Sequence, residues 1–351
     1  MLSKKQNFLE TIKKDGKPDR LVKQFEGTSF LPGDPVNTFV RGTRFPGMPP
    51  MTDLWGTTIL WPVDSIGAMP HVTEENKVVR DITCWREFTK VPDLIANCSA
   101  EEAWGPYLER AAKIDRGESL LMMFAPTGQF ERTHFLMGFE DTFLNIMLEP
   151  EAMEDLEAAI GEYRYNGMKL MTDMVHPDIM LSHDDWGSKT NLFMRPEQWR
   201  ELIKPNYEKI YNYMHEQGVI IMHHSDSYCM PIVQDMVDLH IDIWQGALPQ
   251  NDLEKVLQET DGQLTIMGGL DAAIVDRKDS TEEEIRAEVR RACDAYAKYG
   301  HFIPCITYGG PGTVYPQADQ YINAEIDAWN MEHFGICSDA PDAEQPSLMN
   351  K

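Results

Sequence analysis

The chain has 351 residues, 42% of them hydrophobic, and its 57 acidic against 32 basic side chains give a formal net charge of −25. A surface this acidic repels nucleic acid and anionic lipid, so we expect neither as a partner. The six cysteines form no CxxC pair, which is typical of a reducing compartment. No apolar run reaches the roughly 18 residues of a membrane-spanning helix, and the first twenty residues lack a signal-peptide core. These features predict a cytoplasmic protein.

Short apolar runs alternate with helical patterns over most of the length. Strand–helix–strand units at this spacing build right-handed parallel sheets. The predicted strands are 20–26, 119–126, 178–185, 218–224, 241–247, 264–270 and 301–309. No GxGxxG follows the first strand, and polar residues gather at the carboxyl ends of several strands. We therefore predict an α/β fold, a distorted (β/α)8 TIM-type barrel, as a single domain over residues 1–337.

Three amphipathic stretches predict helices between these strands. The first, 149–175, has Pro150 in its first turn. The second, 195–218, ends at a glycine. The third, 280–300, begins with Ser280 as N-cap and also ends at a glycine.

Residues 28–75 break this rhythm, because they are rich in Pro, Gly, Trp and Phe and show no clear period. A loop this long inside a domain is usually functional or disordered. Its aromatic residues, among them Phe30 and Trp55, argue against disorder, so we predict an insertion that covers the barrel mouth. Residues 338–351 are predicted to be a flexible tail.

Polar residues at the predicted strand ends should meet at one barrel mouth. They are Glu26, then His183, Asp184, Asp185 and Trp186, then His223, His224 and Asp226, and finally Cys305 and Tyr308. Cysteine, histidine and carboxylates are the ligands that zinc takes, and catalytic zinc sites keep one position open. We predict a metal site of His224 and Cys305 with Asp226 or Glu26.

Several of these residues also fit a simpler interpretation. Asp185 and Trp186 could cap a turn, and Cys305 fits a small buried hydrophobe. Because side chains alternate along a strand, His223 and His224 should face opposite sides. His223 is then a core residue or a support for its neighbour. Glu26 is harder to explain by packing, since a buried carboxylate is costly unless it is paired or metal-bound.

Four stretches resemble the uroporphyrinogen decarboxylase superfamily. They are "KKQNFLETIKKDGKPDR", "DDWG" followed by "RPEQWRELIKPNY", "GVIIMHHSD" and "LTIMGGLD", in this order, within about residues 4–335. The resemblance implies a distorted (β/α)8 barrel. The Arg-Gln-Ala-Gly-Arg segment of the true decarboxylases is absent, and the predicted mouth is acidic and aromatic rather than basic. Decarboxylation of a porphyrinogen is therefore not expected.

The other branch of this superfamily contains zinc-dependent methyltransferases that work with a corrinoid protein. Its coenzyme M members carry a His-x-Cys motif and a distant Cys. His224 matches the histidine, Asp226 replaces the first Cys, and Cys305 lies near the distant one. An oxygen ligand leaves zinc more Lewis acidic, which suits an ether oxygen. The segment 238–243 lacks the glycine of a corrinoid-binding loop, so cobalamin is expected only on a separate protein.

The resemblance thus implies the first methyltransferase of a bacterial O-demethylase system. It would use Zn²⁺ to move a methyl group from a small methoxylated aromatic substrate to the cob(I)alamin of a separate corrinoid protein. The expected catalytic residues are Asp184, Asp185 and His223, and the expected substrate-binding residues are Phe30, Trp55, His183, Trp186 and Tyr308. The alternatives are a metal-dependent hydrolase or lyase, a coenzyme M-type methyltransferase, and an accessory barrel without chemistry. A homodimer is possible.

Overall fold

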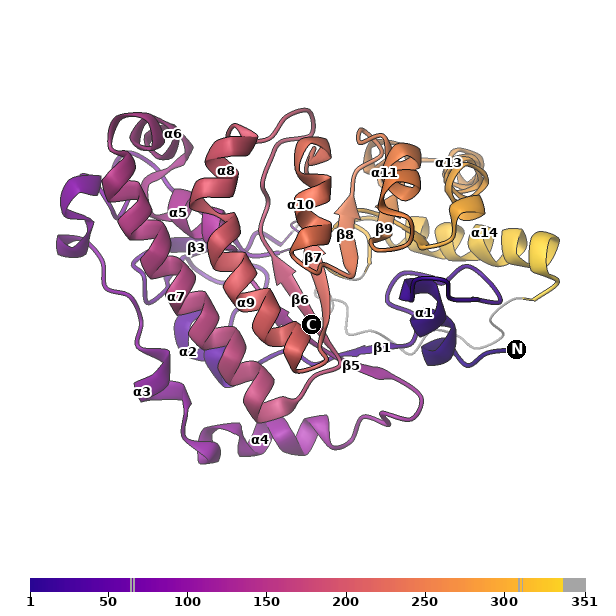
Figure 1. The fold of residues 1–351 in the computed structure, drawn as a ribbon, viewed down its shortest axis with the longest axis horizontal. Coiled ribbons are helices and arrows are strands. Elements are labelled where there is room, and N and C mark those ends of the chain that lie inside the picture. The colour runs from indigo at the N-terminus through magenta and orange to yellow at the C-terminus, as the bar shows by residue number, and fades with distance from the viewer. Residues whose placement is uncertain (64, 66, 309, 311, 337–351) are drawn as a thin grey trace.

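Seven parallel strands form one curled sheet, a distorted and incomplete barrel (Figure 1). The computed structural model describes residues 1–351 except 64, 66, 309, 311 and 337–351, so the predicted tail lies outside the described residues. In sheet order the strands are β1 (Thr28–Phe30), β5 (Leu120–Ala125), β6 (Ile179–His183), β7 (Ile220–His224), β8 (Ile243–Ala247), β9 (Thr265–Gly269) and β10 (Phe302–Cys305). Six of the seven predicted strands are confirmed. They are continuous apolar runs, as expected for strands that are buried on both faces.

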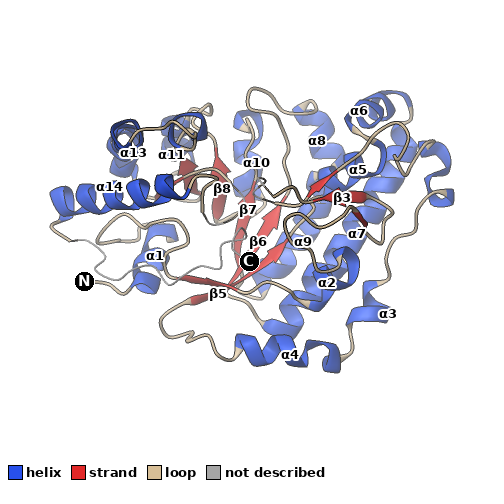
Figure 2. Cartoon of the chain, turned by 180° about the vertical axis from the view of Figure 1, so that it is seen from behind, coloured by secondary structure: helices blue, strands red, loops and turns tan. Residues whose placement is uncertain are grey.

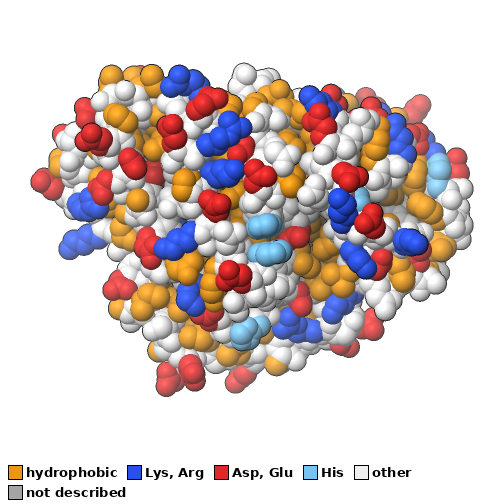
Figure 3. Space-filling view, in the orientation of Figure 1, with side chains coloured by type: hydrophobic (Ala, Val, Ile, Leu, Met, Phe, Trp, Pro, Cys, Tyr) orange, Lys and Arg blue, Asp and Glu red, His pale blue; other side chains and the backbone are white. Residues whose placement is uncertain are grey.

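Helices cover the outside of the sheet (Figure 2). They are α1 (Lys4–Ile12), α2 (Pro35–Arg41), α3 (Leu94–Cys98), α4 (Glu101–Ala111), α5 (Gln129–Met137), α6 (Phe139–Leu148), α7 (Pro150–Val175), α8 (Pro196–Leu202), α9 (Lys204–Glu216), α10 (Val233–Asp238), α11 (Leu253–Thr260), α12 (Ala272–Val275), α13 (Glu282–Tyr296) and α14 (Pro316–Phe334), with 3₁₀ turns η1 (Ile82–Glu87), η2 (Met230–Ile232) and η3 (Ala297–Tyr299). No helix among the described residues is long and apolar enough to cross a membrane. On the face shown in Figure 3, acidic and basic side chains are interspersed.

The seam between β1 and β10 is closed by side chains. No ladder joins these two strands within the part of the chain that the structure describes. Instead, Asn330 of α14 accepts a hydrogen bond from Leu21 N (2.8 Å) and donates one to Leu21 O (3.0 Å). Lys23 adds an ion pair with Asp327 (2.6 Å). These contacts hold the segment after α1 against α14.

The prediction of a strand over residues 20–26 is wrong. These residues form turns, and Phe25 has a positive φ of 55°, which a strand does not allow. Val22 and Phe25 pack with Phe8 of α1 against Leu120 and other residues inside the sheet. Because Leu120 is the first residue of β5, this apolar plug closes the amino end of the barrel.

Two helix predictions need correction in detail, whereas the helix predicted over 149–175 is confirmed as α7. The stretch 195–218 forms two helices, α8 and α9, because Pro205 has no N–H to continue α8 and begins a new helix instead. Thr281 rather than Ser280 caps α13, through a hydrogen bond to Glu284 N. The glycine at 300 follows η3, which extends α13.

The segment 28–75 has more structure than its irregular sequence predicts. Its first residues form β1 of the main sheet, so the insertion begins after Phe30. It continues with α2 and with a small antiparallel sheet of β2 (Met51–Thr52), β3 (Thr58–Leu60) and β4 (Met69–Pro70). Asp53 anchors this sheet to α5 through a buried ion pair with Arg132 (2.7 Å).

Candidate metal centre

Two histidines and one aspartate meet at the carboxyl ends of β6 and β7. His183 and His224 are the last residues of these strands and lie side by side in register, with ring centroids 4.2 Å apart. Asp185 follows two residues after His183, and its Oδ1 lies 3.8 Å from His224 Nε2. One potential ligand atom from each of the three residues lies within 4.8 Å of the others. The sequence predicts His224 as a ligand, but the other two members were expected in other roles.

A glutamine fixes the orientation of His224. Its Nδ1 forms a short hydrogen bond with Gln245 Oε1, and Gln245 Nε2 donates to the carbonyl of Tyr308 (2.8 Å). Because Gln245 uses its amide nitrogen for Tyr308, its oxygen must accept, and His224 carries its proton on Nδ1. Burial, with the charge of His183, lowers the pKa of His224 to about 3. The ring is therefore neutral, and the Nε2 lone pair is free.

A glutamate fixes the orientation of His183 in the same way. Glu131 Oε2 accepts from His183 Nδ1 (3.0 Å) and from Gly128 N (2.7 Å). Burial would lower the pKa of His183, but the charge and hydrogen bond of Glu131, with Asp185 and Asp226 nearby, raise it to about 9. Conversely, burial would raise the pKa of Glu131, but His183 and the N–H of Gly128 hold it below its usual range. Glu131 was not among the predicted site residues, and it lies 52 residues from His183 in the sequence.

Asp184 is a buried structural carboxylate. It accepts hydrogen bonds from the backbone N–H groups of Phe130 (3.1 Å) and Glu131 (3.0 Å), and from Tyr207 Oη (2.9 Å) and Trp186 Nε1 (3.0 Å). It therefore satisfies the free N–H groups at the start of α5. Burial and the charge of Glu131 raise the pKa of Asp184 to about 6.

This carboxylate explains the glycine at the N-cap of α5. A Cβ at Gly128 would lie 2.0 Å from the carboxyl carbon of Asp184. Asp184 thus fixes the first turn of α5, and with it the position of Glu131. The structure places Asp184 behind the site, where it positions other residues.

His223 and Trp186 face away from the three residues of the candidate centre. Their rings stack on each other, with centroids 3.9 Å apart, and His223 Nδ1 bonds with Tyr211 Oη (2.6 Å). Both are fully buried between the sheet and the helices, beside Trp199. Burial, with the charge of His224, lowers the pKa of His223 well below its usual value. The pair packs as a core that supports the strand end carrying His224.

Gln245 pairs with His224 in the β7–β8 ladder, and a β-bulge follows it. The register of β8 on β9 shifts between Gln245 and Ala247, and Gly246 between them has a φ of +87°. A Cβ at Gly246 would lie 2.9 Å from the His224 ring, so only glycine fits. Bulges often aim a side chain next to an active site, and this one aims the amide of Gln245.

The donor set fits a divalent metal ion. Two neutral or neutralisable imidazoles and a carboxylate would be supplied by His183, His224 and Asp185, which leaves coordination positions open, as in catalytic zinc sites. Metal-bound histidines almost always bond through their other nitrogen to a carboxylate or another acceptor, as Glu131 and Gln245 do here. Burial and the neighbouring charge of Asp226 raise the pKa of Asp185 well above its usual value, so a cation at this position would offset an unfavourable charge.

The other predicted ligands lie outside this group. Glu26 precedes β1 instead of ending a strand, so it lies at the amino end of the barrel, beside Arg20 (3.5 Å). Cys305 is buried in the interior apolar cluster with Met267 and Ile303. Asp226 donates its backbone N–H to Asp185 Oδ1 (3.0 Å), and burial raises its pKa to about 6.

A cavity of about 700 Å³ opens between the strand ends and the insertion. Its walls include the predicted substrate residues Phe30 and His183, and Glu131. Trp55 and Tyr308 are not among its lining residues. Trp55 is buried against Tyr163, and the backbone carbonyl of Tyr308 holds Gln245.

The expectation of an acidic mouth is wrong in one respect. Three arginines, Arg41, Arg44 and Arg110, also line the cavity, two of them from α2 and the turn after it. Arg41 and Arg44 come from the irregular insertion, whose path the sequence pattern did not predict, and Arg110 comes from α4.

The fold is a distorted barrel, and three residues that could hold a metal ion lie at the carboxyl ends of its strands. The family model described as uroporphyrinogen decarboxylase (URO-D) matches residues 135–317, just over half of the chain. The chain therefore belongs to the uroporphyrinogen decarboxylase family.

A solved structure of a methyltransferase shares the fold. A methyltransferase from Methanosarcina mazei superposes with a TM-score of 0.62 at 16% sequence identity, over 94% of this chain and 99% of that one. A rutinosidase from Aspergillus niger covers 65% of this chain and 71% of its own at 10% identity, and its TM-score of 0.31 is too low to carry an argument. No curated protein matches the sequence.

Proposed function

We propose that this protein is a methyltransferase that moves a methyl group from a small methoxylated aromatic compound to the cob(I)alamin of a separate corrinoid protein. We further propose Zn²⁺ as the ion held by His183, Asp185 and His224. One observation carries the proposal, namely that two imidazoles with oriented Nδ1 atoms converge with a carboxylate at the strand ends. Family membership and the fold shared with a methyltransferase support it.

Cleavage of an aryl ether requires stabilisation of the negative charge that develops on its oxygen. The leaving aryloxide is the conjugate base of an acid with a pKa of about 10, as for tyrosine. Bound Zn²⁺ would supply Lewis-acid stabilisation of the negative charge that develops on this oxygen. The C–O bond breaks as the methyl carbon forms its bond to cobalt, and the electron pair stays on the oxygen, which takes up a proton as the phenol leaves.

The side chains around the cavity would orient the substrate. Hydrogen bonds from Nδ1 to Glu131 and Gln245 prevent the rings of His183 and His224 from rotating, and so fix the positions of their Nε2 atoms. Phe30 and Phe124 line the cavity with their rings 6.2 Å apart in an edge-to-face arrangement, and a third aromatic ring could pack beside them.

Metal content and a reconstituted assay test this function. Purified protein should contain zinc near one equivalent by mass spectrometry, and His224→Ala should lose most of it. His215→Ala is the matched control, because this exposed histidine of α9 stacks on His240 and does not belong to the candidate centre. Zinc-loaded protein should convert cob(I)alamin on a corrinoid protein to methylcobalamin when a methoxyarene is added. The absence of methyl transfer from every member of a methoxyarene panel would refute the proposal.

The alternatives give different results in the same experiments. A metal-dependent hydrolase or lyase also uses two histidines and a carboxylate, but it would turn over without a corrinoid protein. A coenzyme M-type enzyme would require a thiol, and the candidate group contains no sulfur ligand. An accessory barrel would hold no tightly bound metal.

A further inference from the structure

Arg44 lines the cavity with a guanidinium that has no partner. Its Nε and both terminal nitrogens are shielded from bulk solvent, and none of them forms a hydrogen bond. A guanidinium carries five N–H donors and stays charged in proteins. Leaving such a charge buried and unpaired is strongly unfavourable, so the fold must gain a counter-charge from elsewhere.

Arg41 adds a second positive charge at the same wall. It is the last residue of α2, and burial together with the charges of Arg44 and Arg132 lowers its pKa to about 10. Within the described part of the chain, no ion pair is found for Arg41 or Arg44. Two arginines that repel each other at a cavity wall are an arrangement suited to an anionic ligand.

The acidic residues near these arginines are already engaged. Asp53 pairs with Arg132 (2.7 Å) and accepts two backbone N–H groups. Glu131 bonds with His183, and Asp34 caps α2 and accepts from the Asn37 amide. None of these carboxylates forms an ion pair with Arg41 or Arg44, and their charges do not offset the burial that lowers the pKa of both guanidinium groups.

We propose that Arg41 and Arg44 form an anion subsite and that the methoxylated substrate is an aryl carboxylate. This inference rests on the proposed function, because it names the substrate class of the same cavity. Glu131 and His183 line the cavity together with both arginines, so one small molecule can contact the subsite and His183, one of the three proposed metal ligands. The volume of about 700 Å³ lies within the usual range for small-molecule sites.

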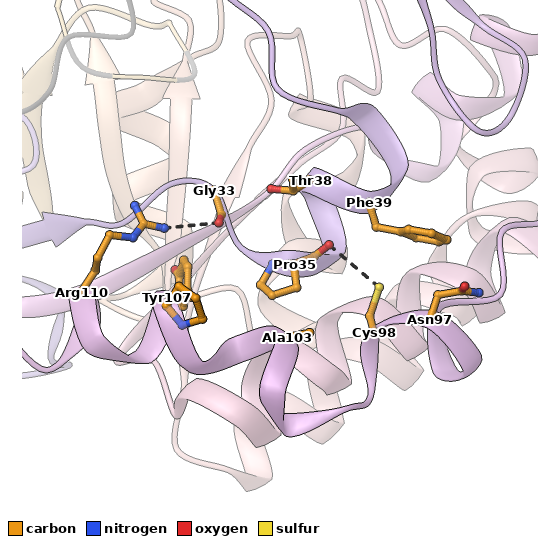
Figure 4. Close-up of a pocket in the computed structure, with 10 residues that line it drawn as sticks. Gly33, Pro35, Thr38, Phe39, Asn97, Cys98, Ala103, Tyr107 and Arg110 are labelled. Atoms are coloured by element: carbon orange, nitrogen blue, oxygen red, sulfur yellow. Dashed lines mark hydrogen bonds between the residues drawn. The ribbon is translucent and has the colours of Figure 1, made fainter.

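Arg110 provides a matched control in the same cavity wall. Its guanidinium already donates to the carbonyls of Pro32 (2.9 Å) and Gly33 (3.3 Å), and it lies over the Tyr107 ring. Figure 4 shows this hydrogen bond to Gly33 in a neighbouring pocket of about 340 Å³. Its charge is thus used by the protein itself.

Calorimetric binding to zinc-loaded protein tests the subsite. The probes are 3-methoxybenzoate and 3-methoxybenzamide, which have nearly the same shape but differ in charge. Wild type should bind the acid about 10- to 100-fold more tightly, the range of a charge-assisted hydrogen bond. Arg44→Met should abolish this preference, Arg44→Lys should retain part of it, and Arg110→Met should keep it. Equal binding of both probes to wild type, or an unchanged preference in Arg44→Met, would overturn the inference.

Stability separates a binding role from a packing role. Because Arg44→Met removes a buried unpaired charge and keeps an apolar stem, it should raise the melting temperature of the ligand-free protein. A lower melting temperature would assign Arg44 to packing and overturn the inference. Inorganic phosphate and acetate are then compared as competitors of 3-methoxybenzoate. If phosphate displaced 3-methoxybenzoate at a lower concentration than acetate does, the carboxylate assignment would be overturned.

The two proposals fail separately, since binding is measured without a corrinoid protein. A carboxylate preference without any methyl transfer would refute the methyltransferase and leave the subsite in place. Methyl transfer that is equally efficient from the acid and the amide would support the methyltransferase and refute the carboxylate subsite. A higher KM for the corrinoid protein in Arg44→Met, with the ligand preference unchanged, would assign the arginine to partner binding and overturn the subsite.

Discussion

Replacing Gln245 by leucine removes the group that orients His224 without touching a proposed ligand. The substitution leaves two buried groups without partners, the Nδ1–H of His224 and the carbonyl of Tyr308. A buried donor or acceptor that loses its partner costs about 1–3 kcal/mol. Loss of the group behind a metal-bound histidine typically weakens metal binding about 10- to 100-fold, or about 1.4–2.7 kcal/mol. We expect the Kd for Zn²⁺ to rise by this factor in Gln245→Leu.

Competition with a chromogenic zinc chelator measures this Kd directly. Gln258→Leu is the control, since the amide of Gln258 bonds only with Tyr299 Oη at the surface (2.7 Å) and should leave the Kd unchanged. Gln245→Leu should also unfold at a lower urea concentration even without metal, because the carbonyl of Tyr308 stays unpaired. If Gln245→Leu bound Zn²⁺ as tightly as wild type while His224→Ala did not, the orienting role of Gln245 would be refuted.

Three further changes have definite expected outcomes. Glu131→Gln keeps a hydrogen-bond acceptor for His183 but removes the negative charge, and chelator competition should show a Kd for Zn²⁺ raised by about tenfold. An unchanged Kd would contradict the role given to the Glu131 carboxylate. Gly128→Ala forces Asp184 from the start of α5 and should lower the unfolding free energy by roughly 3–5 kcal/mol. Gly105→Ala, in an open position of α4, should instead raise the unfolding free energy by about 0.5–1 kcal/mol. Urea titrations in which both variants changed the unfolding free energy in the same direction would contradict this. Burial raises the pKa of Glu157 from 4.5 to about 8, so the folded state keeps this proton while the unfolded state loses it, and stability should fall as pH rises from 4.5 to 8. Glu157→Gln should therefore reduce the difference between the urea midpoints at pH 5 and pH 8. A difference equal to that of wild type would show that the carboxyl ionises normally.

The barrel strands were predictable because their composition matches their environment. Residues 119–126 and 218–224 are continuous apolar runs, and the parallel sheet buries them on both faces. The stretch 20–26 mixes three apolar residues with charged ones, and it forms turns. Val22 and Phe25 serve there as a plug beneath the strands, and nothing in a local pattern distinguishes a buried turn from a short strand.

The candidate centre was predictable only in part. Strand alternation requires that His223 and His224 face opposite sides, and the structure places only His224 in the group of potential ligands. Glu131 could not be found by looking at strand ends, because it belongs to the first turn of a helix. Its local signal is the segment Gly128-x-x-Glu131 directly after an apolar strand, a helix start with an acidic residue at the third position.

The two halves of the cavity are built independently of each other. The residues of the candidate metal centre lie at the ends of strands whose positions depend on the sheet, on the bulge at Gly246 and on the buried carboxylate of Asp184. The opposite wall is a separate piece, α2 with the small three-stranded sheet, tied to the barrel by contacts such as the Asp53–Arg132 pair. Insertions or substitutions in residues 31–75 can therefore change the shape of the cavity while His183, Asp185 and His224 keep their positions. If the proposed function holds, exchange of this one segment would alter the choice of substrate without altering the proposed metal centre.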